Sequence, residues 1–101
     1  PARRLHDFCS ESGVDCWVGT VPELGVGQSQ AVHLATLPNC KDATDAAPPI
    51  RWLVDDVVVP AIEFDEPGKF VVSSRPGLGH LLDPLKVRRY QVRFQEWHLE
   101  A

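Results

Sequence analysis

The sequence predicts an α/β fold in which two helix–strand units are followed by a hairpin and a terminal helix. Three observations support this: apolar residues spaced as on one helical face, short apolar runs bounded by glycine, and alternation of these patterns over the first half of the chain. Such alternation is typical of parallel strands joined by crossovers, as in barrels and doubly wound sheets. The pattern alone does not choose between those two architectures.

The first unit is a helix over 2–12 followed by a strand over 14–20. Leu5, Phe8 and Cys9 are spaced as on one helical face, and Gly13 ends the helix. The following run is short, contains Val and Trp, and is bounded by Gly13 and Gly19. It has the character of a buried parallel strand.

The second unit is a helix over 25–37, ended by Pro38, and a more polar strand over 40–45. The helix places its apolar residues close to one face: Val26, Ala31, Leu34, Ala35 and Leu37. A helix, a strand, a helix and a strand therefore follow one another in the first 45 residues.

The second half predicts a hairpin and a last helix. Asp65-Glu-Pro-Gly68 has the chemistry of a tight turn, which predicts a hairpin over 62–72. Asp83 and Pro84 suit the N-cap and first position of a helix. That helix is expected to dock through an apolar face made of Val87, Tyr90, Phe94 and Trp97.

Composition narrows the class of protein. The chain has 101 residues, 44% of them hydrophobic and 24% charged, as in soluble globular proteins. A net charge of −4 makes a nucleic-acid partner unexpected, and no apolar run approaches a membrane span. Three cysteines without CxxC spacing indicate reduced thiols in a cytoplasmic protein rather than a zinc site. The first residue is Pro1 rather than Met, which suggests truncation or processing.

A candidate site lies in the loop Gly19–Gly27, between the first predicted strand and the next helix. Ligands bind at the carboxyl ends of parallel strands in both architectures. Glycines permit close approach of the backbone, and the first amides of a helix are unpaired donors that favour an anion. We therefore expect Gly25, Val26 and Gly27 to face a carboxylate or phosphate.

Two acidic residues are candidates at this end of the strands. Glu23 is the ionisable group of the loop, and if desolvated it would have a raised pKa and donate a hydrogen bond to a substrate oxygen. A merely exposed glutamate is the alternative. Asp45 ends the second strand and would open onto the same face, or else cap the turn before Pro48. His33 and His80 are expected to be a hydrogen-bonded boundary residue and part of a chain reversal.

The residues resemble a known family. Trp17-Val-Gly-Thr-Val-Pro-Glu-Leu-Gly-Val-Gly27 and His33-Leu-Ala-Thr-Leu-Pro-Asn39 resemble the seventh barrel strand and helix of the muconate lactonizing subgroup of the enolase superfamily. The resemblance extends back to Ala2–Asp7, similar to the sixth helix, and forward to Pro76-Gly-Leu-Gly79. Intermediate matches are Thr44-Asp45, Arg51-Trp52 and Asp55-Asp56.

This resemblance implies the C-terminal part of a (β/α) TIM-type barrel, which when complete needs about 250 residues. Residues 1–56 would be the last βα units, and 57–101 a wrapping tail with the hairpin and terminal helix, together one incomplete domain. The complete enzyme would abstract a proton α to a carboxylate, with Mg²⁺ stabilising the enediolate. Such enzymes include o-succinylbenzoate synthases, N-acylamino acid racemases and muconate cycloisomerases.

The resemblance also assigns site residues. Glu23 matches the acidic catalytic residue near the substrate carboxylate, Thr20 and Val21 match pocket-wall positions, and Asp45 matches the end of the eighth strand. Gly19, Gly25 and Gly27 complete the predicted substrate-binding set. The base lysines and metal carboxylates of the family lie upstream of Pro1, so Mg²⁺ would be bound outside this segment and no metal ligand is expected within it.

The expected partners are the N-terminal remainder of the same enzyme, a small carboxylate substrate and further copies in a homo-oligomer. The chain departs from the family pattern at Val21-Pro22 and at Leu24, which leaves the substrate open.

Two other functions remain open. Gly25-x-Gly27 after a strand, with Asp45 further on, resembles a Rossmann-like dinucleotide-binding fingerprint, although Gln30 replaces its third glycine. The third possibility is a noncatalytic scaffold or interaction module derived from a barrel, binding a partner through exposed strand edges.

Overall fold

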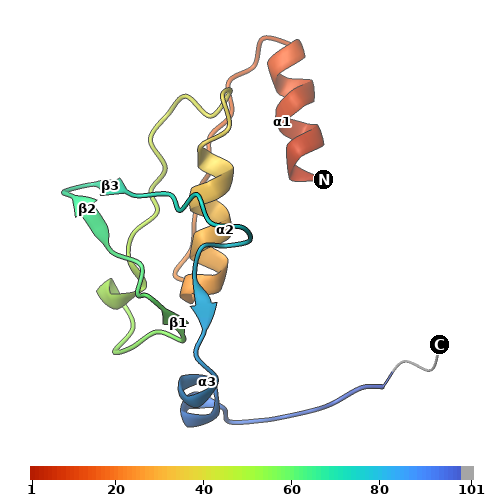
Figure 1. Ribbon diagram of the computed structural model, residues 1–101. Coiled ribbons are helices and arrows are strands. Elements are labelled where there is room, and N and C mark those ends of the chain that lie inside the picture. The colour runs from red at the N-terminus through yellow and green to blue at the C-terminus, as the bar shows by residue number, and fades with distance from the viewer. Residues whose placement is uncertain (99–101) are drawn as a thin grey trace.

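The chain begins with helix α1 (Ala2–Glu11), in a computed structural model that describes residues 1–98 (Figure 1). The predicted helix over 2–12 is confirmed to within one residue. Burial of its apolar face is not: Leu5 and Phe8 are 63% and 66% exposed, whereas His6 is 7% exposed. Helix α1 is anchored through a polar contact, since the Asn39 amide donates to His6 Nε2 at 3.0 Å.

The two predicted strands, 14–20 and 40–45, are extended segments that run in parallel. They are joined by one parallel bridge, between Cys16 and Cys40, and Thr44 Oγ1 donates to the Val18 carbonyl at 2.7 Å. The parallel direction agrees with the prediction, but regular strands over these ranges do not form. A strand ladder needs continuous pairing with neighbours, and the bridge is isolated within the described residues.

Helix α2 (Gly25–Ala35) confirms the second predicted helix, two residues shorter at its end. Its predicted apolar face is only half-buried, and the buried residues are Gly25, Gln28 and Ser29. The start of α2 is buried because it lies directly against the tail: a Cβ placed on Gly25 would overlap Val58 Cγ2. The Asp56 and Val58 side chains can approach the α2 backbone this closely because Gly25 has no Cβ.

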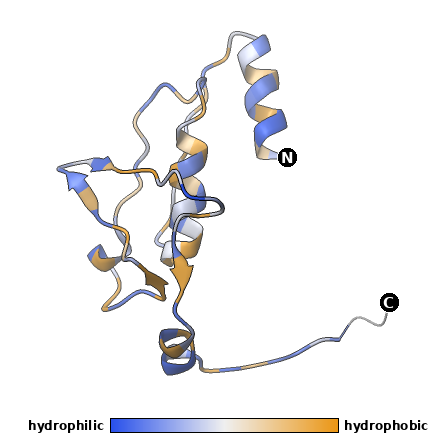
Figure 2. Ribbon diagram, in the orientation of Figure 1, coloured by the Kyte–Doolittle hydropathy of each residue, from blue (hydrophilic) through white to orange (hydrophobic). Residues whose placement is uncertain are grey.

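After a 3-10 helix η1 (Pro49–Arg51), the tail forms strand β1 (Val58–Val59). It pairs antiparallel with β4 (Leu81–Leu82), Val58 opposite Leu82, although the sequence predicted neither strand. Figure 2 shows hydrophobic residues side by side on these two strands. The buried hydrophobic residues of the described chain are Ala46, Val57, Val58 and Ile62, so the core lies around β1.

The predicted hairpin over 62–72 is confirmed as a shorter one. Strands β2 (Phe64–Glu66) and β3 (Lys69–Phe70) pair antiparallel around a turn in which Gly68 has φ of +78°. Only glycine adopts that φ without strain. The rings of Phe64 and Phe70 lie across the pair with centroids 4.7 Å apart, which stabilises the two short strands.

The last helix, α3 (Pro84–Tyr90), begins where the sequence predicts. Asp83 caps it by accepting hydrogen bonds from the amides of Leu85 at 2.9 Å and Lys86 at 3.3 Å. Docking through an apolar face is wrong: the helix ends at Tyr90, and Phe94 and Trp97 are 70% and 79% exposed. Residues 91–98 run away from the body of the chain (Figure 1), and positions 99–101 of the predicted tail lie outside the described residues.

Helix α3 is held instead by the Asp55 carboxylate. Oδ1 accepts hydrogen bonds from Lys86 Nζ at 2.7 Å and from the Asp56 amide at 2.8 Å, while Oδ2 accepts one from Tyr90 at 3.1 Å. The Lys86 hydrogen bond, followed by the Asp56 amide and then Tyr90, lowers the pKa of Asp55 to about 2. The same pair raises the pKa of Lys86. Three donors around one carboxylate favour its charged form.

A pH titration is therefore expected to release α3 under acid conditions. The folded pKa of Asp55 is depressed, so its stabilising effect is full above the unfolded value, about 3.9, and is lost as pH falls toward 2. NMR titration of the Asp55 side-chain carbon measures this directly. Lys86→Met should move the midpoint up toward the unfolded value, with Lys69→Met as the control. A midpoint near 4 in the unsubstituted chain would contradict the contact.

The described chain is open rather than closely packed. Its radius of gyration is 16.0 Å, against about 13 Å for a compact domain of this length. Many large apolar side chains are exposed, including Leu81 on β4 and Leu85 on α3, at 77% and 74%. Nothing within residues 1–98 covers them. The helices of this part of the chain are too short or too polar to cross a bilayer.

Candidate substrate-binding site

The ends of the two parallel segments are joined by Thr20 and Asp45. Asp45 Oδ1 accepts hydrogen bonds from the Thr20 amide at 2.8 Å and from Thr20 Oγ1 at 2.9 Å. Side by side, parallel segments end at the same edge, where loops of α/β folds meet ligands. Asp45 therefore lies beside Thr20, where the loop that leads to Glu23 begins, and so at the same edge as that loop, as the sequence predicted. What the sequence did not predict is that Asp45 binds Thr20.

Glu23 lies against the first turn of α2. A Cβ built on Gly27 would overlap Glu23 Oε2, so the absence of a side chain at Gly27 is what makes room for this carboxylate. Glu23 itself is exposed. The desolvated state that would favour a proton on it therefore requires cover from outside the described residues.

The first amide of α2 is already occupied by an anion of the protein itself. The Gly25 amide donates to Asp56 Oδ1 at 3.0 Å, and the Val57 amide donates to the same oxygen at 2.7 Å. Asp56 is 8% exposed, and its Oδ2 is buried without a hydrogen-bond partner in the described chain. Asp56 thus caps α2 from 31 residues away. The expectation that the Gly25 amide faces a substrate anion does not fit this arrangement.

Gly19 and Val21 complete the predicted set. A Cβ on Gly19 would lie 2.5 Å from the Trp17 ring, whose Nε1 donates to the Ala43 carbonyl at 2.7 Å. Gly19 is therefore required for the Trp17 ring to lie across the backbone between the two segments. Val21 is 62% exposed at the edge where the segments end. Val21 could form a pocket wall only if residues outside the described chain lay against it.

The histidines have the structural roles expected of them. His33 Nδ1 lies 2.7 Å from the Ser29 carbonyl, and His80 Nδ1 lies 2.8 Å from the Pro60 carbonyl, so each Nδ1 carries the proton. A third histidine, His6, joins α1 to Asn39 and was not predicted. Among residues 1–98, no three His, Cys, Asp or Glu side chains are grouped so that they could hold a metal ion.

Gly25→Ala tests the contact between the start of α2 and the tail. The added Cβ would overlap both Asp56 Oδ2 and Val58 Cγ2, so either α2 or β1 must shift. We expect the free energy of unfolding to fall by about 1–3 kcal/mol, as it does at overpacked core sites. Amide hydrogen exchange at residues 25–28 should accelerate by a corresponding factor. The matched control is Gly27→Ala, where the new methyl meets only the flexible end of Glu23. Equal exchange in both variants would contradict the packing.

Known proteins are similar to this chain in sequence and in fold. No family model matches the chain. It is 35% identical to an o-succinylbenzoate synthase from Geobacillus kaustophilus, over 99% of this chain and 26% of that protein. It is also 36% identical to an N-succinylamino acid racemase from Amycolatopsis, over 77% of this chain and 21% of that protein.

Two solved structures have the same fold. A probable mandelate racemase from Alicyclobacillus acidocaldarius superimposes with a TM-score of 0.84 at 35% identity, covering 91% of this chain and 25% of that one. A member of the enolase superfamily from Listeria innocua superimposes with a TM-score of 0.79 at 26% identity, covering 86% and 23%. The chain is therefore similar, over most of its length, to proteins of the enolase superfamily.

This similarity confirms the resemblance found in the sequence and is consistent with an α/β segment of such a protein. The chain spans about a quarter of the length of the relatives it matches. The open shape and the exposed apolar residues are expected of a segment that packs against the rest of a longer protein. The closed TIM-type barrel, its division at residue 56 and the substrate-binding roles of the site residues stay predictions.

Proposed function

We propose that the chain forms one wall of the substrate site of an enolase-superfamily isomerase or lyase, as the C-terminal segment of its barrel. The supporting observation is the hydrogen-bonded pair Thr20–Asp45, which brings the ends of two parallel segments and the loop carrying Glu23 to one edge. Active sites of barrel enzymes are built at this edge from several loops. The rest of the site belongs to the remaining N-terminal part of the enzyme.

Within that site, Glu23 is the proposed catalytic residue. Once the remainder of the enzyme covers the loop, a protonated Glu23 donates a hydrogen bond to the substrate carboxylate as charge develops on it. Gly27 leaves the space for this side chain, while Thr20 and Val21 form the adjacent wall. Gly19 and Asp45 position the wall through Trp17 and Thr20. Gly25 supports the site through Asp56 rather than by binding substrate itself.

The proposed substrates are small carboxylates, and the proposed reaction is removal of a proton α to the carboxylate. Relatives named o-succinylbenzoate synthase and N-succinylamino acid racemase share a succinyl group in their printed names, which makes succinylated acids the first compounds to test. Magnesium supplies electrostatic stabilisation of an enolate in such chemistry. The described residues hold no cluster that fits the ion, so no step through Mg²⁺ is assigned to them.

The direct test uses the full-length protein that contains this chain. In D₂O with an N-succinylamino acid and Mg²⁺, NMR should show exchange of the α-hydrogen, and a chelator should stop it. The isolated chain should show neither exchange nor one-site Mg²⁺ binding by calorimetry. Exchange by the isolated chain would contradict the proposal, as would a full-length protein that binds Mg²⁺ yet exchanges none of the succinylated acids or related α-carboxylates.

The other functions make different predictions. A dinucleotide-binding protein would bind NAD with saturation, but the Gly25-x-Gly27 motif is engaged by Asp56 and Glu23 here. A noncatalytic scaffold would bind a partner without any exchange. We further propose that the full-length protein is cytoplasmic and forms a homo-oligomer. Light scattering of the full-length protein would test the oligomeric state.

A further inference from the structure

The two parallel segments meet at a pair of cysteines. Cys16 and Cys40 form the parallel bridge between them, and the Cys16 amide donates to the Asn39 carbonyl at 2.9 Å. Neighbouring parallel strands lie about 4.7–4.9 Å apart, and the side chains of paired residues point to the same face. A disulfide requires Cα atoms about 4.4–6.8 Å apart. The pairing of the backbones therefore holds these two cysteines at a separation that a disulfide can span.

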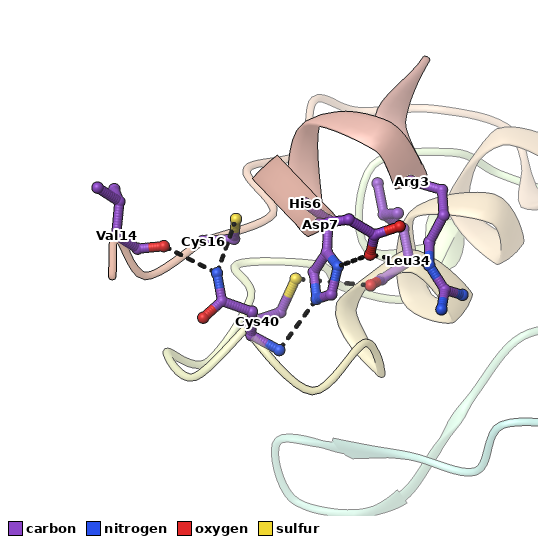
Figure 3. Close-up of polar contacts among 8 residues, drawn as sticks. Arg3, His6, Asp7, Val14, Cys16, Leu34 and Cys40 are labelled. Carbon is purple, nitrogen blue, oxygen red and sulfur yellow. Dashed lines mark hydrogen bonds and ion pairs between the residues drawn. The ribbon is translucent and has the colours of Figure 1, made fainter. Parts of the chain in front are cut away.

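The two cysteines also share a cavity beside α1. Cys16 and Cys40 line this space of about 110 Å³ together with Leu5 and His6 of the helix. Figure 3 shows Cys16 and Cys40 beside His6, with the Cys40 thiol directed toward Leu34. Both cysteines are half-buried and carry free thiols. The shared cavity gives the two sulfurs room to turn toward each other by rotation of their side chains.

The two thiols have opposite hydrogen-bonding roles. Cys16 Sγ accepts a hydrogen bond from Asn39 Nδ2 at 3.4 Å, whereas the Cys40 thiol donates to the Leu34 carbonyl at 3.6 Å. A donor directed at a sulfur favours its charged form, and the thiolate is the nucleophile. Burial, followed by the charge of Cys16, raises the pKa of Cys40. Cys16 is therefore the sulfur that is placed to attack first.

We propose that Cys16 and Cys40 are a redox pair that a low-molecular-weight disulfide oxidises to a reversible disulfide between the two parallel segments. The Cys16 thiolate attacks one sulfur of the small disulfide, forming a mixed disulfide and releasing one small thiol. The Cys40 thiolate then attacks Cys16 Sγ, forming the Cys16–Cys40 bond and releasing the second small thiol. Two protein thiols lose two electrons and two protons, and one small disulfide gains them.

Closure of the bond depends on the ionisation of Cys40. His6 does not serve as its base, because Nε2 accepts from the Asn39 amide at 3.0 Å and Nδ1 lies 2.8 Å from Asp7 Oδ1. The proton of Cys40 therefore leaves to solvent. Since its pKa is raised, closure should be slow at neutral pH and accelerate by up to about tenfold per pH unit until Cys40 is ionised.

The test treats the full-length protein with oxidised glutathione, alkylates the remaining thiols and maps the products without reduction. A glutamate-specific protease is suitable, because cleavage after Glu11 and Glu23 puts Cys9, Cys16 and Cys40 on different peptides. We expect a linked pair of peptides containing Cys16 and Cys40, an alkylated Cys9, and separation of the pair by dithiothreitol. A dominant Cys9–Cys16 or Cys9–Cys40 pair, or glutathione adducts without an internal bond, would overturn the proposal.

Cys9 is the competing thiol, because burial followed by hydrogen bonding to Cys16 raises its pKa. Cys9→Ser should nevertheless still form the disulfide, with circular dichroism as the check on folding. In Cys40→Ser, glutathione should remain on Cys16, whereas Cys16→Ser should leave Cys40 largely unmodified at neutral pH. Loss of the internal bond in a folded Cys9→Ser protein would overturn the pairing. The mapping is independent of the proposed enzymatic function, which could fail while the disulfide forms.

Discussion

Replacing Glu23 by Gln in the full-length enzyme is expected to lower kcat by about ten- to a thousandfold, the scale for losing one group that stabilises developing charge. Glutamine keeps the size of the side chain, so the packing of the loop against Gly27 is retained. What changes is the acidity of the donor: a protonated Glu23 can share its proton with the substrate carboxylate, whereas a glutamine amide cannot. Steady-state kinetics with a succinylated acid would measure kcat and KM separately.

The matched control is Glu11→Gln, at the exposed end of α1 and outside the loop, where both constants should be unchanged. A rise in KM with constant kcat would mean that Glu23 binds substrate and transition state equally. Unchanged kinetics in Glu23→Gln would make it a surface residue and remove it from the proposed site.

The parts of the fold that the sequence predicted are those that depend on local chemistry. The cap and start of α3 depend on Asp83 and Pro84, and the hairpin turn depends on Gly68, each within four residues of its effect. Regular strands over 14–20 and 40–45 were wrongly predicted, because a strand is completed by its neighbours rather than by its own residues. Helix α3 ends early for a similar reason: Phe94 and Trp97 meet no apolar surface within residues 1–98.

The site shows the same division. That Asp45 and the loop after Thr20 lie at one edge followed from parallel strands, and the hydrogen bonds between Thr20 and Asp45 agree with it. Asp56 was missed, because its partner Gly25 is 31 residues away and no spacing pattern joins them. The sequence showed Asp55-Asp56 as a segment that matches the family and as an acidic pair directly before an apolar run, but neither observation assigns Asp56 a partner.

Asp56→Ala is expected to destabilise the full-length protein by about 1–3 kcal/mol, because it leaves the amides of Gly25 and Val57 without their acceptor. The loss includes the cap of α2, the helix that follows the Glu23 loop, so activity should fall with stability. Urea denaturation should show a lower midpoint at an unchanged slope. Asp56→Asn keeps an oxygen acceptor at the same position, so its loss should be clearly smaller. Equal losses in the two variants would show that the negative charge, rather than the hydrogen bonds, is what matters.

A double-mutant cycle with Gly25→Ala separates the cap from general packing. The alanine methyl overlaps the Asp56 carboxylate, so removing that carboxylate creates the space that the methyl needs. The double variant should therefore lose less stability than the sum of the two single variants, with a coupling of about 0.5–3 kcal/mol for residues in contact. The pair Asn39→Ala and Gly25→Ala should be additive, because the Asn39 side chain contacts Val14 and Cys16 whereas a methyl on residue 25 meets Asp56 and Val58. If the cycle at Gly25 and Asp56 were also additive, Asp56 would not be the residue that fixes the start of α2 on the tail.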